Sequence, residues 1–218
     1  IRRKEDVLQV KYLLHKLKKN VPIVAKIEMP LAVKNIEEII SVSDMIMVAR
    51  GDMGVELGNH LVPAVQKRII TLCNLKGVPV ITATQMLESM ISNSTPTRAE
   101  ASDVANAIWD GTDAVMLSGE TASGKFSSEA VIMMDKIVRE AEKAPKERPF
   151  LRNMDLSTVN KSVMVAASLI AEKTNAKAIL AITQSGHSCL NMTRFRPLSE
   201  VLGITTDVGA VRRMALYW

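Results

Sequence analysis

The segment Ala25-Lys26-Ile27-Glu28 places a cation and a carboxylate two residues apart. On a strand the two side chains would project from the same face, and alone they would be an ordinary ion pair. A second carboxylate, Asp52, follows the next apolar segment, so neighbouring parallel strands would bring two acids together. Two carboxylates repel unless a cation lies between them. Oxygen ligands favour Mg²⁺ or Mn²⁺ over zinc, and neither His nor Cys is nearby in the sequence.

Two further apolar segments end in polar residues that could face the same cavity. Thr84 follows one of them, and Ser118 and Glu120 follow the other. Gly51 and Gly54 would let the backbone turn tightly after the strand and approach a ligand closely. A short helical turn beginning here would direct backbone N–H groups at an anion. A lysine, a divalent cation and backbone N–H groups around one cavity are suited to stabilising a developing oxyanion.

The elements that position these residues alternate between apolar and amphipathic segments. We predict strands over residues 21–28, 44–49, 79–83 and 113–117, and helices over 5–19, 33–41, 60–76, 98–109 and 128–143. Strands separated by helices pair in parallel through right-handed crossovers. The polar residues all fall at carboxyl ends of strands, which is where a (β/α) barrel carries its active site. This α/β pattern favours a barrel over an open sheet.

A second domain is predicted after residues 144–149, where two prolines and mixed charges indicate a linker. We expect domains over residues 1–144 and 150–218. The second should contain helices at about 158–174 and up to 195, and strands at 178–183 and 200–205. Its loop after the first strand could hold a phosphate group or be an ordinary strand-to-helix connection. The candidate effector-binding residues in that loop are Thr183, Ser185, Gly186 and Ser188.

Composition excludes several classes of protein. The 218 residues carry a net charge of +5, and seven Lys or Arg lie in the first twenty positions. This basic cluster fits the exposed face of one helix, whose apolar side would be Val7, Val10, Leu13, Leu14 and Leu17, better than a nucleic-acid surface. Two distant cysteines indicate neither a disulfide framework nor a zinc site, and a cytoplasmic location is expected. No apolar segment approaches a membrane span in length, and the chain does not open with a signal-peptide pattern.

Five segments together resemble pyruvate kinase in their order and spacing. They are residues 25–28 (AKIE), 47–54 (MVARGDMG), 83–90 (ATQMLESM), 96–100 (PTRAE) and 116–122 (MLSGETA). The resemblance implies the last four strands of a (β/α)8 TIM barrel, followed by part of an α/β regulatory domain. It also implies phosphoryl transfer from phosphoenolpyruvate to ADP, giving pyruvate and ATP, in glycolysis.

The resemblance assigns a role to each matching residue. Lys26 matches the lysine that stabilises the enolate, and Glu28 and Asp52 match the ligands of the divalent metal. Gly51 and Asp52, through backbone N–H groups, and Thr84, through its hydroxyl, match the site for the substrate carboxylate. Ser118 and Glu120 would support the site, and Arg50 would orient the adjacent turn rather than act on substrate.

The family also implies partners and missing parts. Arg98 would lie at a subunit interface of a homotetramer, or be a solvent-exposed residue of a first helical turn. A sugar phosphate or nucleotide would be the effector. The K⁺ ligands, the nucleotide-binding arginine and the lid domain would precede this segment, because Ile1 to Lys4 resembles the end of an earlier strand. We therefore expect the isolated chain to be inactive.

Two alternatives remain at this point. The chain could be a non-catalytic regulatory or oligomerisation fragment that binds an effector phosphate. It could also come from another barrel enzyme that handles phosphoenolpyruvate or an enolate with Mg²⁺. The segments 47–54 and 116–122 argue against the latter.

Overall fold

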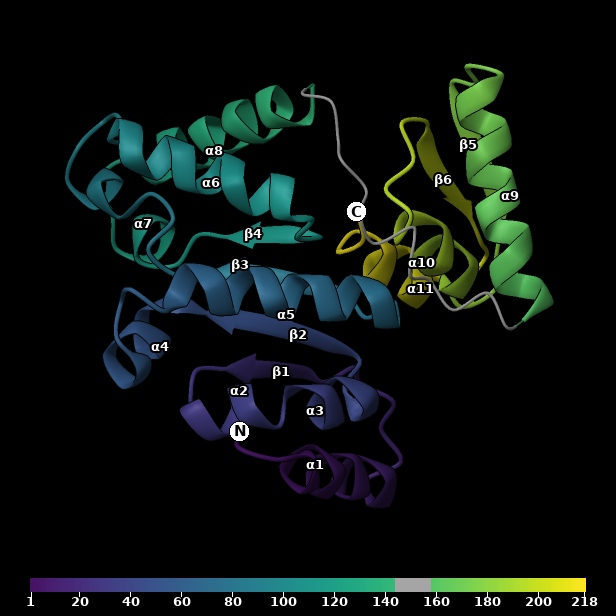
Figure 1. The fold of residues 1–218 in the computed structure, drawn as a ribbon, viewed down its shortest axis with the longest axis horizontal. Helices are drawn as coiled ribbons and strands as arrows, with labels where there is room; N and C mark the ends of the chain where they lie inside the picture. The colour runs from purple at the N-terminus through teal and green to yellow at the C-terminus, as the bar shows by residue number, and fades with distance from the viewer. Residues whose placement is uncertain (144–157) are drawn as a thin grey trace. The chain divides into compact units, whose positions relative to one another are not determined.

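The computed structural model of this protein describes residues 1–143 and 158–218. Figure 1 shows the ribbon, and the chain divides into a first unit, residues 1–146, and a second unit, residues 147–218. Each unit is described by itself. The predicted linker at 144–149 and the predicted domain boundaries at 144 and 150 lie outside the described residues.

The first unit is built on a four-stranded parallel sheet in chain order. Its strands are β1 (Val24–Ile27), β2 (Met45–Ala49), β3 (Val80–Ala83) and β4 (Ala114–Met116). The four arrowheads point the same way, towards α4 and α7 in Figure 1. Since all strands are parallel, the residues that follow each of them gather at one edge of the sheet. All four predicted strands are confirmed, and β1 begins three residues later than expected, after Pro22.

Helices separate the strands, as the sequence pattern predicts. They are α1 (Lys4–Lys16), α2 (Pro30–Lys34), α3 (Ile36–Val42), α4 (Arg50–Leu57), α5 (Val62–Lys76), η1 (Glu88–Ile91), α6 (Arg98–Asp110), α7 (Gly119–Ala122) and α8 (Ser127–Glu142). The single helix predicted over 33–41 is instead two helices that meet at Asn35. The chain turns after β2 by entering a helix, as expected, and this helix, α4, begins directly at Arg50 and includes Gly51.

The two faces of the sheet have different neighbours. One face carries Ala25, Ile27, Ile46, Val48 and Val80, which belong to a core shared with the surrounding helices. The opposite face carries a smaller apolar cluster of Met45, Ile81 and Ala83 with Met47, Ala114 and Met116. Lys26 is in register with Met47, which is in register with Ile81. Lys26 therefore projects from the second face, at the end of a layer of apolar side chains.

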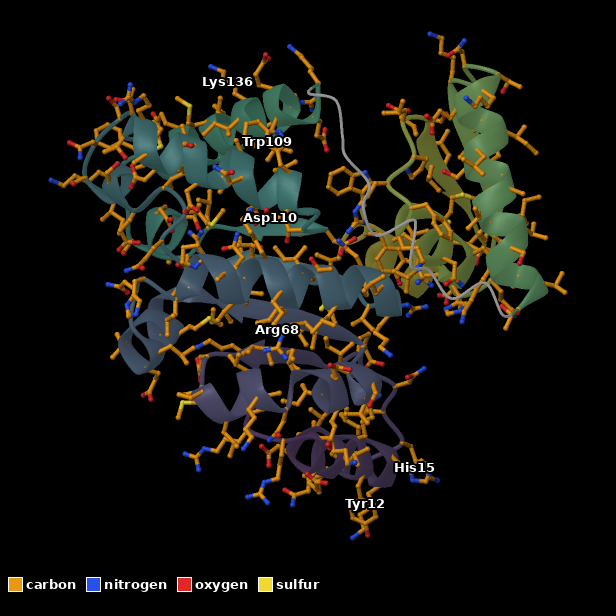
Figure 2. The ribbon with its side chains drawn as sticks, in the orientation of Figure 1. Tyr12, His15, Arg68, Trp109, Asp110 and Lys136 are labelled. Carbon is orange, nitrogen blue, oxygen red and sulfur yellow. The ribbon has the colours of Figure 1, made fainter. Side chains whose placement is uncertain are left out.

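Helix α1 does not bury the apolar side that the sequence predicts. Val7 is buried, but Val10, Leu13 and Leu17 are exposed, and Leu14 is only partly covered. Figure 2 shows Tyr12 and His15 projecting outward from this helix. Among the described residues, α1 packs on α3 and leaves most of its remaining surface to solvent.

The second unit contains two parallel strands and three helices within residues 158–218. Its elements are α9 (Val159–Lys173), β5 (Ala178–Ile182), α10 (His187–Thr193), β6 (Glu200–Ile204) and α11 (Val208–Met214). The strands pair in parallel along five residues each, from Ala178 beside Glu200 to Ile182 beside Ile204. Within the described ranges, no helix is both long and apolar enough to cross a membrane.

Candidate active site

Lys26 and two carboxylates meet at the carboxyl ends of β1 and β2. Lys26 Nζ lies 2.6 Å from Glu28 Oε2 and 3.0 Å from Asp52 Oδ2. Glu28 follows β1 directly, and Asp52 lies in the first turn of α4, which begins where β2 ends. Because Lys26 Nζ contacts both oxygens, the carboxylates of Glu28 and Asp52 lie close enough for one cation to contact both. The parallel sheet thus brings together the three charged groups that the sequence suggested.

The charges of this cluster reinforce one another. Contact with Glu28 and then with Asp52 raises the pKa of Lys26 above its ordinary value of 10.5. The hydrogen bond from Lys26 lowers the pKa of Asp52 below its ordinary value of 3.8. Lys26 is therefore a cation at neutral pH and can stabilise negative charge, but it cannot serve as a base. Asp52 is a carboxylate under the same conditions.

The donor set suits a small divalent cation bound through oxygen. Glu28 Oε2 is shielded from solvent and accepts no hydrogen bond of normal geometry among the described residues, although the Lys26 ammonium is close to it. Within the same residues, no group of three or more His, Cys, Asp or Glu side chains forms an all-protein metal cage. Mg²⁺ commonly binds through one or two carboxylates and completes its coordination with water and substrate oxygens. Glu28 and Asp52 fit that role.

Thr84 adopts a backbone conformation that a threonine rarely takes. Its φ is +71°, and that of Gln85 is +53°, immediately after β3. A β-branched residue at positive φ is strained, by about 1–3 kcal/mol. In this conformation Thr84 Oγ1 accepts a hydrogen bond from the Gly51 N–H at 2.8 Å and donates one to the Ala83 carbonyl at 2.6 Å. The strained turn therefore brings the Thr84 hydroxyl against the first turn of α4.

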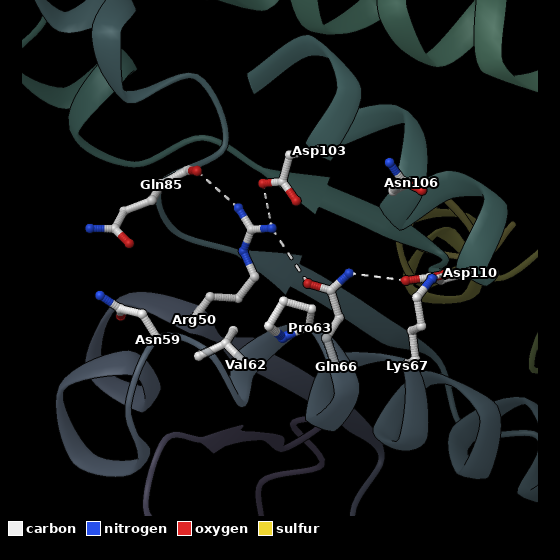
Figure 3. A pocket seen from close by; sticks show the side chains of 10 residues that line it. All are labelled: Arg50, Asn59, Val62, Pro63, Gln66, Lys67, Gln85, Asp103, Asn106 and Asp110. Atoms are coloured by element: carbon white, nitrogen blue, oxygen red, sulfur yellow. Dashed lines mark hydrogen bonds and ion pairs between the residues drawn. The ribbon is translucent and has the colours of Figure 1, made fainter. Parts of the chain in front are cut away.

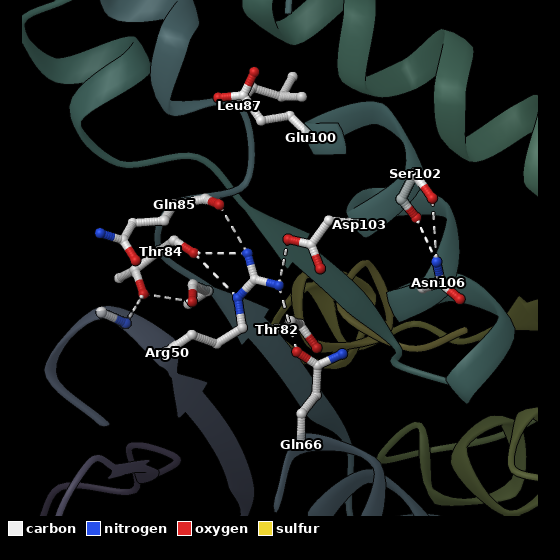
Figure 4. A network of polar contacts seen from close by, with 12 residues as sticks. Arg50, Gln66, Thr82, Thr84, Gln85, Leu87, Glu100, Ser102, Asp103 and Asn106 are labelled. Carbon is white, nitrogen blue, oxygen red and sulfur yellow. Dashed lines mark hydrogen bonds and ion pairs between the residues drawn. The ribbon is translucent and has the colours of Figure 1, made fainter. Parts of the chain in front are cut away.

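Arg50 holds this turn in place from a buried position. Its guanidinium donates to the Thr84 carbonyl from Nε at 3.2 Å and Nη2 at 2.9 Å, and to the Gln85 carbonyl at 2.9 Å. The Arg50 Nη1 atom forms an ion pair with Asp103 of α6 at 2.6 Å. Figure 4 shows the guanidinium between the turn at Thr84 and Gln85 and the side chain of Asp103. The sequence predicts that Arg50 orients its own adjacent turn. In the structure Arg50 begins α4 and its side chain also orients the turn after β3.

Glu120 and Ser118 build the neighbouring connection after β4. Glu120 is completely buried, and its carboxylate accepts hydrogen bonds from the backbone N–H groups of Leu87 at 3.1 Å and Ser118 at 2.8 Å. Glu120 thereby ties the segment after β3 to the segment after β4. Both residues act on the architecture of the edge, and in the described structure Glu120 does not contact the Lys26 cluster.

Glu100 joins α6 to the segment after β3. Its carboxylate accepts from the Ser89 N–H at 2.7 Å and hydroxyl at 2.6 Å, and from the Thr97 N–H at 2.7 Å. Burial acts to raise the pKa of Glu100, but the hydrogen bonds from Ser89 and Thr97 outweigh it, and the pKa lies below its ordinary value. The Thr97–Glu100 spacing is that of a capping box, a signal that was available in the sequence.

Arg98 and the loop of the second unit lie apart from this cluster in the chain. Arg98 is the exposed first residue of α6. In the second unit, Thr183 Oγ1 accepts from the Gly186 N–H at 3.1 Å, and Gly186 has a φ of +86°. Ser185 is exposed and its carbonyl accepts from Arg213 at 3.4 Å, while Ser188 lies in the first turn of α10. These contacts define the conformation of the loop.

Two polar partners of Arg50, the buried Gln66 and the partly exposed Asp103, were not anticipated from the sequence. Gln66 on α5 accepts from Arg50 Nη1 at 3.4 Å, and Asp103 on α6 forms the ion pair. Both line a cavity of about 460 Å³ beside Arg50, drawn in Figure 3. Gln66 carries no sequence signal, since a single amide in an amphipathic helix resembles any surface residue.

Comparison with known proteins places the whole chain in one family. The sequence model of the pyruvate kinase barrel domain matches residues 1–131, and that of the pyruvate kinase alpha/beta domain matches residues 161–218. Over its full length the chain is 48% identical to pyruvate kinase of Staphylococcus saprophyticus and 46% identical to that of Staphylococcus aureus. It is 45% identical to pyruvate kinase 2 of Synechocystis.

The chain spans 38% of the length of the two staphylococcal enzymes and 37% of the Synechocystis enzyme. The parallel sheet of the first unit and the small parallel sheet of the second agree with part of a TIM barrel and an α/β domain, which confirms the predicted fold class. With both domain models matched in order along the chain, we conclude that this protein belongs to the pyruvate kinase family.

Proposed function

We propose that this chain supplies the enolate-stabilising and metal-binding half of a pyruvate kinase active site. The observation that carries the proposal is the position of Lys26 Nζ between Glu28 and Asp52, at the edge where Gly51 meets Thr84. The reaction would transfer the phosphoryl group of phosphoenolpyruvate to ADP. The substrate's P–O bond breaks and a bond to an ADP oxygen forms. The electron pair stays on the enolate, which takes up a proton at C3 to give pyruvate.

Lys26 would stabilise the enolate oxygen as negative charge develops on it. Its raised pKa keeps the ammonium protonated throughout the neutral range. A fixed cation beside a developing oxyanion lowers the barrier because it interacts more strongly with the transition state than with the neutral ground state. Phosphoryl transfer depends mainly on positioning and charge neutralisation, which are the properties that this lysine offers.

Glu28 and Asp52 would hold the divalent cation, for which we propose Mg²⁺ or Mn²⁺. When bound, such an ion neutralises phosphoryl and enolate charge. Both carboxylates already face a cation in the described structure, namely Lys26. The lowered pKa of Asp52 keeps that ligand ionised well into the acid range.

The Gly51 N–H and the Thr84 hydroxyl would bind the substrate carboxylate. The two groups lie 2.8 Å apart at the beginning of α4, so they would donate to one anion once the Gly51 N–H releases Thr84 Oγ1 and the Thr84 hydroxyl releases the Ala83 carbonyl. The left-handed turn at Thr84 sets the position of the hydroxyl, and Arg50 sets the turn.

Family membership extends the proposal to the longer protein. For that protein we propose glycolytic activity in the cytoplasm, K⁺ dependence, ADP and ATP as nucleotides, and a homotetramer with Arg98 at an interface. We also propose a sugar phosphate or nucleotide as the effector of the loop containing Thr183, Ser185, Gly186 and Ser188.

The test is a titration of Mn²⁺ into the chain, followed by water-proton relaxation, with and without phosphoenolpyruvate. We expect saturable binding that Glu28→Ala and Asp52→Ala each weaken at least about tenfold. Glu56→Ala is the matched control, because Glu56 is an exposed acid on the same helix as Asp52. Equal titrations for wild type and both site variants, or no binding by folded wild type, would overturn the assignment.

A further inference from the structure

Gln66 lies buried between a group that can only donate hydrogen bonds and a group that accepts them. Its Oε1 accepts from Arg50 Nη1 at 3.4 Å, and its Nε2 donates to Asp110 Oδ2 at 3.1 Å. The Gln66 residue is 5% exposed and the Asp110 side chain 9%. Asp110 also forms an ion pair with Lys67 at the rim of the same cavity. Figure 3 shows the chain of contacts from Gln85 through Arg50 and Gln66 to Asp110.

The chemistry of the two neighbours dictates the polarity of residue 66. A guanidinium has no acceptor, and an ionised carboxylate has no donor. A primary amide presents one acceptor and two donors, so it satisfies both neighbours in a single orientation. Leucine of similar size would satisfy neither neighbour. Glutamate would satisfy Arg50 but would place two carboxylates against each other. A buried donor that loses its acceptor destabilises the folded state. Replacing Gln66 would therefore favour a different orientation of the Arg50 guanidinium.

Arg50 carries the constraint from Gln66 to the candidate active site. The same guanidinium that donates to Gln66 also donates to the Thr84 and Gln85 carbonyls. Those carbonyls belong to the two residues at positive φ, a conformation that persists only where its surroundings enforce it. Loss of the Gln66 contact would leave Arg50 with Asp103 as its remaining side-chain partner among the described contacts.

We propose that Gln66 is a positioning residue for the substrate-carboxylate site. It fixes the Arg50 guanidinium in the orientation that holds the left-handed Thr84 turn, and thereby sets the Thr84 hydroxyl against the Gly51 N–H. Gln66 itself contacts neither Thr84 nor Gly51 in the described structure, so it acts through Arg50. The proposal rests on the proposed function, in which Gly51 and Thr84 bind the substrate carboxylate.

The test follows the Gly51 amide by ¹⁵N–¹H NMR and amide hydrogen exchange in the full 218-residue chain without metal. Gln66→Leu should shift the Gly51 resonance and speed its exchange several-fold, because its acceptor Thr84 Oγ1 moves. Gln66→Glu should do the same through repulsion from Asp110. The double variant Gln66→Glu/Asp110→Asn restores one acceptor and one donor, and should return the Gly51 resonance towards wild type. Asn106→Ala is the matched control, since Asn106 lines the same cavity but bonds only to Ser102 among the described contacts.

Supporting outcomes combine a Gly51 change in Gln66→Leu with recovery in the double variant. The proposal is overturned if Gln66→Leu leaves Gly51 as the Asn106→Ala control does. It is also overturned if the double variant fails to recover Gly51. Amide exchange near β1, such as that of Ala25, monitors general loss of stability. The readout needs no metal, so failure of the Mn²⁺ titration in wild type would refute the proposed function without affecting this result.

Discussion

Lys26 and Asp52 stabilise each other's charged form, and the pH dependence of each follows from its pKa. The folded-state pKa of Asp52 is lowered, so its contribution to stability is present above 3.8 and is lost as pH falls through the lowered value. The folded-state pKa of Lys26 is raised, so its contribution is present below 10.5 and is lost as pH rises through the raised value. The ion pair between Lys26 and Asp52 should therefore persist unchanged from mildly acidic to mildly alkaline solution.

Removing the lysine should reverse the shift at Asp52. In Lys26→Met we expect the midpoint of the Asp52 carboxyl titration, followed by ¹³C NMR, to rise towards the ordinary value of 3.8. The reason is that the Lys26 ammonium, the largest cause of the lowered pKa, is gone. Lys34→Met, on an exposed lysine of α2, should leave the Asp52 midpoint unchanged. An Asp52 midpoint that is insensitive to Lys26→Met would contradict the described cluster.

Glu120 should matter for stability more than for chemistry. In Glu120→Gln the new side-chain amide would keep one acceptor but turn its NH₂ group towards a backbone N–H. The substitution should therefore lower the free energy of unfolding by about 1–3 kcal/mol. Urea denaturation followed by circular dichroism measures the change. Glu129→Gln, an exposed acid in the first turn of α8, is the control and should shift the unfolding midpoint little. Equal midpoints for the two variants would argue against a structural role for Glu120.

At the residue scale, sequence reasoning was strongest where adjacent strand ends converge. Lys26, Glu28 and Asp52 could be grouped because each follows or ends an apolar segment, and the sheet brings them within ion-pair distance. Gln66 and Asp103 could not be grouped in this way. They approach Arg50 from the middle of two long helices, and helical periodicity predicts a buried face without saying which polar side chain on it finds a partner.

Helix α6 is fastened at its first turn by a capping box, with Thr97 and Glu100 as its two members. Glu100 also binds Ser89, so a single carboxylate links this helix to the segment after β3. The start of α6 and the segment after β3 are thus stabilised by the same carboxylate.

Glu100→Gln should lower the free energy of unfolding by about 1 kcal/mol at neutral pH, the usual effect of losing a cap. Because the folded-state pKa of Glu100 is lowered, the difference from wild type should shrink as pH falls below 4.5. Urea titrations at several pH values measure this. Glu88→Gln is the control, being an exposed acid in η1. A difference that is constant with pH would be inconsistent with an ionised cap.

The order of elements was predictable because strand and helix periodicities differ, and because Gly77 and Gly111 end α5 and α6 in left-handed conformations. Boundaries were less predictable. Two glycines within residues 50–54 indicated a tight turn or a short helical turn, but helical hydrogen bonding continues through both glycines to Leu57. The burial of α1 was misjudged, since an apolar stripe predicts a buried face only where another element covers it.

The four-stranded sheet of the first unit has two open edges among the described residues, at β1 and β4. Eight strands close a (β/α) barrel, and closure removes edges of this kind. An open parallel sheet with unpaired backbone groups invites pairing with another chain.

We therefore expect the isolated chain to self-associate. Sedimentation velocity over rising concentration should show species larger than the 23.9 kDa monomer. Val24→Lys places a charge on the edge strand β1, where Val24 is 40% exposed, and should reduce association. Val55→Lys, which changes an exposed valine on α4, is the matched control. A monomer at all concentrations would show that the edges are protected.

The strained threonine after β3 also bears on how such a protein can be improved in the laboratory. A selection for heat resistance alone would reward replacement of Thr84 by glycine, which occupies positive φ without a side-chain clash. The selected variants would lack the hydroxyl that accepts a hydrogen bond from the Gly51 amide. If Thr84 binds the substrate carboxylate as we propose, screens that score only survival after heating should enrich variants that are more stable but bind substrate more weakly.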